Sequence, residues 1–135
     1  MLGRKIISAL LASVIIVLAL AVITYVRDGP AAAKFGEYVF VYSIYVFPTM
    51  FIYGILTSSI SEWLSVKHNQ FAWLWSLLYH IGFGLLFFIP LNLILLVIYH
   101  VVSRIEVVFI LLSGGMGGVF FAVDRIVSRF WDKHK

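Results

Sequence analysis

The sequence predicts an all-α, polytopic membrane protein, a compact antiparallel bundle of four transmembrane helices that forms one domain over residues 1–135. Of these residues 63% are hydrophobic and only 12% are charged, and four long apolar stretches contain no Lys, Arg, Asp or Glu. About 20 apolar residues, rising about 1.5 Å each, cross a hydrocarbon core about 30 Å thick, and a helix satisfies its own backbone groups there. The predicted spans are residues 6–26, 39–60, 71–98 and 107–123.

The first predicted span follows Arg4 and Lys5, so its start has the basic-then-apolar order of a signal peptide. Its apolar run is longer than the roughly 7–15 residues of a signal core, which favours a retained span. We expect the span to end at Asp28-Gly29-Pro30, because Gly tolerates unusual dihedrals and Pro cannot continue the hydrogen bonding of the preceding helix.

Charge counting predicts the orientation of the bundle. Seven of the ten Lys and Arg residues lie at the termini or in the second loop, and three lie in the first and third loops. Cytoplasmic loops carry the excess of positive charge, so the N-terminus and the C-terminus are both predicted to be cytoplasmic. The short loops favour consecutive spans that pack as antiparallel neighbours.

The second predicted span carries a polar stripe, because its hydroxyl side chains recur at spacings of three and four residues. The stripe consists of Tyr38, Tyr42, Tyr45, Thr49, Tyr53 and Thr57. It either lines a hydrated cavity or ligand groove, or makes hydrogen bonds between helices worth about 0.6 kcal/mol each, and we favour the second interpretation. Pro48 in this span and Pro90 in the third each predict a kink. Residues 61–68 are expected to continue as an interfacial helical turn.

The third predicted span contains His80, about 12 Å into the helix from its cytoplasmic end and therefore within hydrocarbon depth. An ionisable group inside the membrane is a functional hypothesis. The same side of the bundle is expected to hold Ser58, Ser61 and Glu62 of the second span and Asp124 after the fourth. Such a polar site would relay protons or bind a cation or a polar ligand, since His titrates near neutral pH. The alternative is a neutral His80 bonded to a neighbouring helix, with Asp124 as an ordinary interfacial charge.

Small residues mark the fourth predicted span as a packing helix. Gly114, Gly118 and Ala122 follow the small-xxx-small spacing that lets two helices approach closely, either against the first span or in a homodimer. A P-loop is excluded, because these glycines lie in an apolar span without the Lys-Ser/Thr that follows a P-loop. Residues 124–133 predict an amphipathic extension in which Arg125 and Arg129 share a face suited to anionic lipid or to a partner protein.

Composition also limits the chemistry of the chain. The absence of Cys excludes disulfides, thiolate metal sites and thiol redox chemistry, and no cofactor is expected. A metal site made by His80 and His100 is excluded, because twenty residues of one helix separate them by roughly 30 Å. The net charge of +4 comes from basic residues beside the spans, where they meet lipid headgroups, so no nucleic-acid partner is expected.

A family resemblance is carried by a few scattered features. They are Phe47-Pro48 through Tyr53-Gly54 and Ser58–Ser61 in the second span, Tyr79-His80 with Gly82 and Gly84 in the third, and Asp124-Arg125 after the fourth. In these features the chain resembles an uncharacterised family of small four-span membrane proteins of Gram-positive bacteria. The resemblance implies a four-span fold and a plasma-membrane location, and it implies no reaction.

The function predicted from the sequence is that of a non-enzymatic accessory or binding protein of the bacterial plasma membrane. The alternative is a small transporter or channel that uses the polar site around His80 and the tyrosine stripe. An enzyme ranks last, because Ser58, His80 and Asp124 supply the residue types of a nucleophile, a base and an orienting group without evidence of contact. The expected partners are membrane lipid and either another membrane protein or a second copy of the chain.

Overall fold

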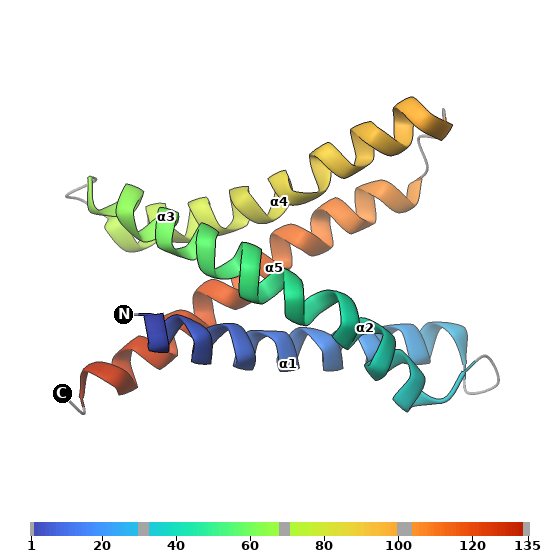
Figure 1. Ribbon diagram of the computed structural model, residues 1–135, viewed down its shortest axis with the longest axis horizontal. Helices are drawn as coiled ribbons and strands as arrows, with labels where there is room; N and C mark the ends of the chain where they lie inside the picture. The colour runs from blue at the N-terminus through green and yellow to red at the C-terminus, as the bar shows by residue number, and fades with distance from the viewer. Residues whose placement is uncertain (1, 30–32, 68–70, 100–103, 134–135) are drawn as a thin grey trace. The chain divides into compact units, whose positions relative to one another are not determined.

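The computed structural model describes residues 2–29, 33–67, 71–99 and 104–133, with side chains described outside 88–110 and 132. All regular structure in these ranges is helical (Figure 1), which confirms the predicted all-α class. The elements are α1 (Leu2–Asp28), α2 (Phe35–Thr49), η1 (Met50–Gly54), α3 (Ile55–Val66), α4 (Ala72–Tyr99) and α5 (Arg104–Asp132).

Three helical stretches of the described chain are long and apolar enough to cross a membrane. They are Leu2–Asp28, the continuous run Phe35–Val66 formed by α2, η1 and α3, and Leu111–Trp131 in α5. The described side chains of α4 add a shorter apolar segment, Ala72–Phe87. These lengths and compositions are those of a membrane protein.

Most of the helices are longer than the apolar stretches that predict them. α1 begins before Arg4 and Lys5, and α5 continues through the charged residues after position 123. Charged side chains do not end a helix, since the helical hydrogen bonds join backbone groups whatever the side chains carry. The helical continuations predicted after residues 60 and 123 are confirmed by α3 and α5.

Helix α1 ends where the sequence places a glycine. Gly29 has a φ of 81°, and its N–H donates to the carbonyl of Tyr25 at 3.0 Å. Glycine suits this left-handed position at a helix end because it has no Cβ to collide with the backbone. The break predicted after the first span is therefore confirmed at Asp28, whereas Pro30 lies outside the described residues.

The second membrane helix changes type after Pro48. The proline ring has no N–H, so the carbonyl of Ile44 loses its helical donor. A π-helical turn then runs over Met50–Gly54 before α3 resumes the α geometry. The interruption predicted at Pro48 takes this form. The kink predicted at Pro90 stays a prediction, because the side chain of Pro90 lies outside the described residues, although the backbone of α4 is helical through it.

Contacts within the chain define two compact units. The first comprises Met1–Leu56 together with Val123–Lys135, and the second comprises Thr57–Ala122. The single four-span domain predicted over residues 1–135 stays a prediction.

The first unit is built on a hairpin of α1 and α2. The two helices lie along each other, and α1 also packs against η1 (Figure 1). The hydroxyls of Thr24 and Tyr42 lie 2.6 Å apart, and the Tyr38 hydroxyl donates to Asp28 at 3.3 Å. These nested contacts are those of an antiparallel pair. The buried residues of α1 are Lys5, Ser8, Ala9, Ala12, Ser13, Ile16, Val17, Ala21 and Thr24, and they are joined by Val46 of α2 and Met50 of η1.

The second unit brings the backbones of α4 and α5 into direct contact. A Cβ on Gly84 would overlap the carbonyl of Ser113, and a Cβ on Gly117 would overlap the carbonyl of His80. The earlier residue on α4 thus meets the later residue on α5, so the two helices run antiparallel here. Only glycine permits this approach, because any side chain would push a rigid backbone aside.

The predicted small-residue face of the fourth span faces α4 only in part. Gly114 lies against side chains of α4, whereas Gly118 meets Ile81 only in ordinary van der Waals contact at 3.9 Å, and Ala122 is exposed. Residues three and four apart share a helix face, so Ser113, Gly114 and Gly117 form the side of α5 that approaches α4 most closely.

Replacing Gly117 by Ala is expected to destabilise the protein by about 1–3 kcal/mol, because the new methyl group meets a carbonyl that moves only with its helix. Thermal unfolding of the purified chain in detergent, followed by circular dichroism, measures the effect. Gly115→Ala is the matched control, since its Cβ would meet no described atom within 4 Å. It should be neutral or stabilise by up to about 1 kcal/mol through helix propensity. Equal melting temperatures for the two variants would contradict the contact.

Candidate functional site

A buried lysine of α1 meets a buried aspartate of α5 in the first unit. Lys5 is 1% exposed, and its Nζ lies 2.7 Å from Oδ2 of Asp124, which is 6% exposed. The hydroxyl of the fully buried Ser8 lies 2.8 Å from Oδ1 of the same carboxylate. Nε of Arg4 lies 3.8 Å from Oδ1. We call Arg4, Lys5, Ser8 and Asp124 the charge cluster.

Helical spacing positions the cluster. Arg4 and Lys5 precede Ser8 by four and three residues, so both lie on the face of α1 that carries Ser8. Ala9 and Ala12 continue this face and are fully buried, so small side chains follow the cluster along α1. On α5, Val123 and Val127 are buried beside Asp124. The charges are thus set among apolar neighbours and not in a hydrated loop.

The hydroxyl of Ser8 has one proton and two acceptors within reach. The carboxylate of Asp124 lies at 2.8 Å, and the carbonyl of Arg4 lies at 3.0 Å. A charged acceptor makes the stronger hydrogen bond, so Ser8 donates to Asp124. Both carboxylate oxygens are then engaged, Oδ1 by Ser8 and Oδ2 by Lys5.

The balance of charge stabilises the ionised cluster. Removing an ion from water costs several kcal/mol, and a partner at hydrogen-bond distance offsets that penalty. Lys5 supplies such a partner, and Arg4 adds a second cation close by. Asp124 lies eight residues before the end of α5, about 12 Å along the helix, so the cluster lies at a helix end and not at its centre.

This arrangement fastens two helices, because each oxygen of Asp124 accepts a hydrogen bond from α1. Among the described residues, no group of three His, Cys, Asp or Glu side chains is arranged to hold a metal ion.

His80, the centre of the predicted polar site, lies in the second unit among aromatic rings. It is 4% exposed, and its Nδ1 lies 2.7 Å from the carbonyl oxygen of Ser76, one turn earlier on α4. The rings of Phe120 and Phe121 lie at centroid distances of 6.1 and 5.4 Å from the imidazole. Because a carbonyl only accepts, Nδ1 carries a proton in this contact.

The other predicted members of the polar site lie on α3 and α5. Ser58 and Ser61 are fully buried on α3, and the Ser61 hydroxyl donates to a backbone carbonyl one turn earlier at 2.7 Å. Glu62 is half-buried. These three residues belong to the second unit with His80, whereas Asp124 belongs to the first and takes partners from α1. The contact predicted between His80 and Asp124 stays a prediction.

The two ends of the polar stripe differ in environment. At its N-terminal end, Tyr38 and Tyr42 bond to Asp28 and Thr24 of α1, as the hydrogen-bonding interpretation of the stripe expects. The π turn at Met50–Gly54 then interrupts the α-helical spacing on which the stripe is counted.

Of the remaining stripe residues, two lie before the π turn, one lies within it and one follows it. Before the turn, Tyr45 is 68% exposed, and the hydroxyl of Thr49 donates to the carbonyl of Tyr45 within its own helix. Tyr53, within the turn, is half-buried, and Thr57, after the turn, is buried. A common surface lined by all six hydroxyl residues stays a prediction.

The count of positive charges used to predict the orientation gives no sign that Lys5 belongs to the cluster. Lys5 counts as a cytoplasmic cation beside the first span, yet its ammonium group is buried against Asp124. The signal in the sequence is the face that Lys5 shares with Ser8 and with small residues, together with a carboxylate at the end of the last span. No local pattern links two residues 119 positions apart.

Comparison with known proteins adds no relative: no family model, curated protein or solved structure matches the chain. The functional interpretation therefore rests on the charge cluster and on the exposure of the helices.

Replacing Lys5 by Met is expected to destabilise the protein by about 3–5 kcal/mol, because it leaves the carboxylate of Asp124 buried without its closest cation. The double variant Lys5→Met/Asp124→Leu should recover most of that loss, since an apolar pair removes both buried charges. Thermal unfolding in detergent measures the wild type, both single variants Lys5→Met and Asp124→Leu, and the double variant. Arg129→Gln, on an exposed position of α5, is the control and should melt with the wild type. Additive losses in the double variant would contradict the ion pair.

Proposed function

We propose that the chain is an integral protein of the bacterial plasma membrane that acts as a non-enzymatic accessory or binding protein. Its four helices would form an antiparallel bundle with both termini in the cytoplasm, and its partner would be another membrane protein or a second copy of the chain. The observation that carries the proposal is the exposed apolar face of α2.

Contacts in the first unit support the proposed topology. The Lys5–Asp124 pair and the position of Gly3 beside the ring of Trp131 join the start of α1 to the end of α5. Two ends held together in this way belong on one side of a membrane, as an even number of crossings requires. The excess of positive charge favours the cytoplasm for that side.

The second membrane helix buries little of itself within the chain. In its most apolar stretch only 11% of the residues of Phe35–Val66 are buried, compared with 39% for α1. We define the α2 face as six exposed apolar residues of this helix in the first unit, four of them on α2, one on η1 and one on α3. They are Phe40, Val41, Ile44, Tyr45, Ile52 and Leu56. A membrane helix with few neighbours in its own chain has most of its surface free for packing against another helix.

The contacts that Asp124 and His80 already make within the chain support a non-enzymatic role. Asp124 has both oxygens bound by α1, and His80 is enclosed by aromatic rings with Nδ1 on a backbone carbonyl. Groups held in this way stabilise a fold. A catalytic site would instead bring a nucleophile, a base and an orienting group to one point.

Photocrosslinking in the native membrane tests the proposal. A photoreactive residue placed at Ile44 or at Ile52 should give a discrete, stoichiometric adduct of one mass, because both side chains are exposed on the α2 face. Val17 of α1 is 3% exposed, so the same residue placed there is the control and should give no intermolecular adduct. Adducts with lipid alone at Ile44 and Ile52 would contradict the accessory function. An adduct of twice the chain's mass would identify the partner as a second copy.

A second candidate function, a small transporter or channel, is favoured by the polar interior of the second unit. Its buried polar residues are Thr57, Ser58, Ser61, Ser65, Ser76, His80 and Ser113. Ser and Thr are also common where membrane helices pack, so the ionisable His80 is the member of this set that favours a pathway for ions or substrates.

The transporter or channel function predicts that His80→Ala in proteoliposomes abolishes a pH-dependent flux while the amount of folded protein stays unchanged. The variant removes the titrating ring and keeps the helix. Flux is followed with a pH-sensitive dye inside the vesicles, and folding is followed by the melting temperature. A collapse of the melting temperature would instead assign His80 to the fold.

A further inference from the structure

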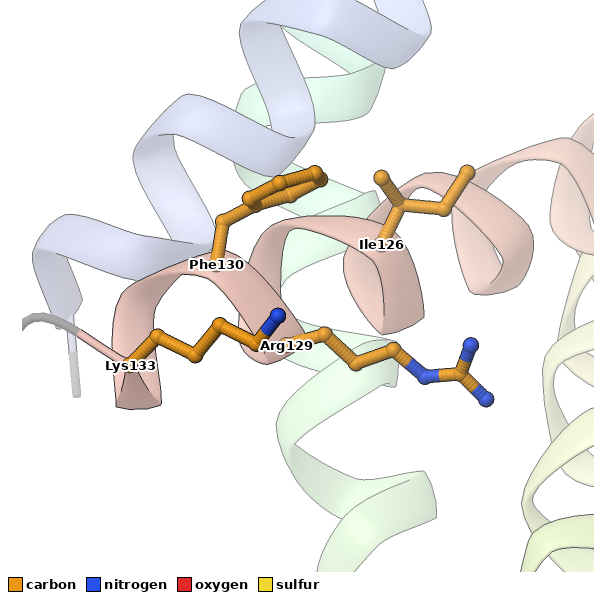
Figure 2. A pocket seen from close by; sticks show the side chains of 4 residues that line it. All are labelled: Ile126, Arg129, Phe130 and Lys133. Carbon is orange, nitrogen blue, oxygen red and sulfur yellow. The ribbon is translucent and has the colours of Figure 1, made fainter.

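The last turns of α5 carry an open groove of about 500 Å³ lined by Ile126, Arg129, Phe130 and Lys133. We call it the C-terminal groove. Figure 2 shows Ile126 and Phe130 along one edge of this groove and the two cationic side chains along the other. Because the four residues are three and four apart, they form one continuous patch of the helix surface.

The cations of the groove are available to a ligand. Arg129 and Lys133 are both exposed, and neither makes an ion pair or a hydrogen bond with any residue that the structure describes. Asp124, which precedes them on α5, is already engaged by Lys5 and Ser8. No described residue therefore neutralises the positive charge of the groove, and this charge suits an anionic ligand.

The apolar side of the groove indicates what kind of anion fits. Ile126 is 55% exposed and Phe130 is 64% exposed, directly beside the two cations. A small water-soluble anion would gain nothing from these surfaces. A phospholipid would bury them under an acyl chain while its phosphate met the cations.

The position of the groove along the helix agrees with a lipid ligand. The 29 residues of α5 extend about 43 Å, which exceeds a hydrocarbon core of about 30 Å, so the last turns reach the headgroups. Trp131, next to the groove, lies beside Gly3 at the start of α1. Tryptophan is enriched at this level of a membrane.

We propose that the C-terminal groove binds one anionic phospholipid, with the phosphate held by Arg129 and Lys133 and an acyl chain packed on Ile126 and Phe130. The guanidinium group of Arg129 offers two parallel N–H donors to phosphate oxygens, and the ammonium of Lys133 adds a point charge. The site requires no protein partner, so its failure and the failure of the accessory function are separate results.

Native mass spectrometry of the full chain in neutral detergent tests the site. Phosphatidylglycerol should bind more tightly than phosphatidylcholine with the same acyl chains. The variant Arg129→Gln/Lys133→Gln should weaken phosphatidylglycerol binding by about 25-fold, since each cation near a membrane surface contributes roughly fivefold. Lys34→Gln/Lys67→Gln removes the same charge elsewhere and should keep the preference. All four side chains are exposed, so both variants should melt with the wild type.

The apolar half of the site has its own test. Ile126→Ser/Phe130→Ser should weaken phosphatidylglycerol binding and leave the binding of soluble glycerol phosphate unchanged. Equal binding of the two lipids by the wild type would overturn the proposal. So would an equal loss in the Lys34/Lys67 control, which would indicate diffuse charge. Glycerol phosphate binding as tightly as the lipid would reassign the groove to a free anion.

Discussion

Asp124 is the acceptor on which the first unit depends. Its carboxylate receives Lys5 and Ser8 from α1, so a contact between residues 119 positions apart closes the unit. Charges that lose a partner in an apolar setting have little water to replace it, which makes such a contact costly to open. The hairpin of α1 and α2 and the groove at the end of α5 belong to this same unit, and the pair joins them.

The helices of this chain could be predicted because a bilayer leaves an apolar stretch few alternatives to a helix. Their ends could not be predicted from the same stretches. Arg4, Lys5 and Asp124 lie inside helices because they pair with one another across the fold, and a count along the chain contains no information about that pairing. The end of α1 was predictable, since Gly29 acts through its local conformation alone.

The candidate site, too, could be predicted from the sequence only in part. Asp124 was recognisable as a lone carboxylate after an apolar stretch, but its partner lies at the other end of the chain. The tyrosine stripe was counted on an α-helix, and the π turn changes that count. Gly117 was hidden beside Gly118, because in a run of glycines spacing alone cannot show which residue faces the neighbouring backbone.

The π turn at Met50–Gly54 also sets the azimuth of the helix that follows it. An α-helix advances about 100° per residue, so the extra residue of a π turn rotates all later side chains by a comparable angle. Before the turn the buried residue of α2 is Val46, and after it the buried residues of α3 all carry hydroxyls: Thr57, Ser58, Ser61 and Ser65. Deleting a single residue there would turn every later side chain of the helix by about 100° around its axis. The length and hydropathy of the span would hardly change, so such a length variant would look conservative in sequence while presenting a different surface.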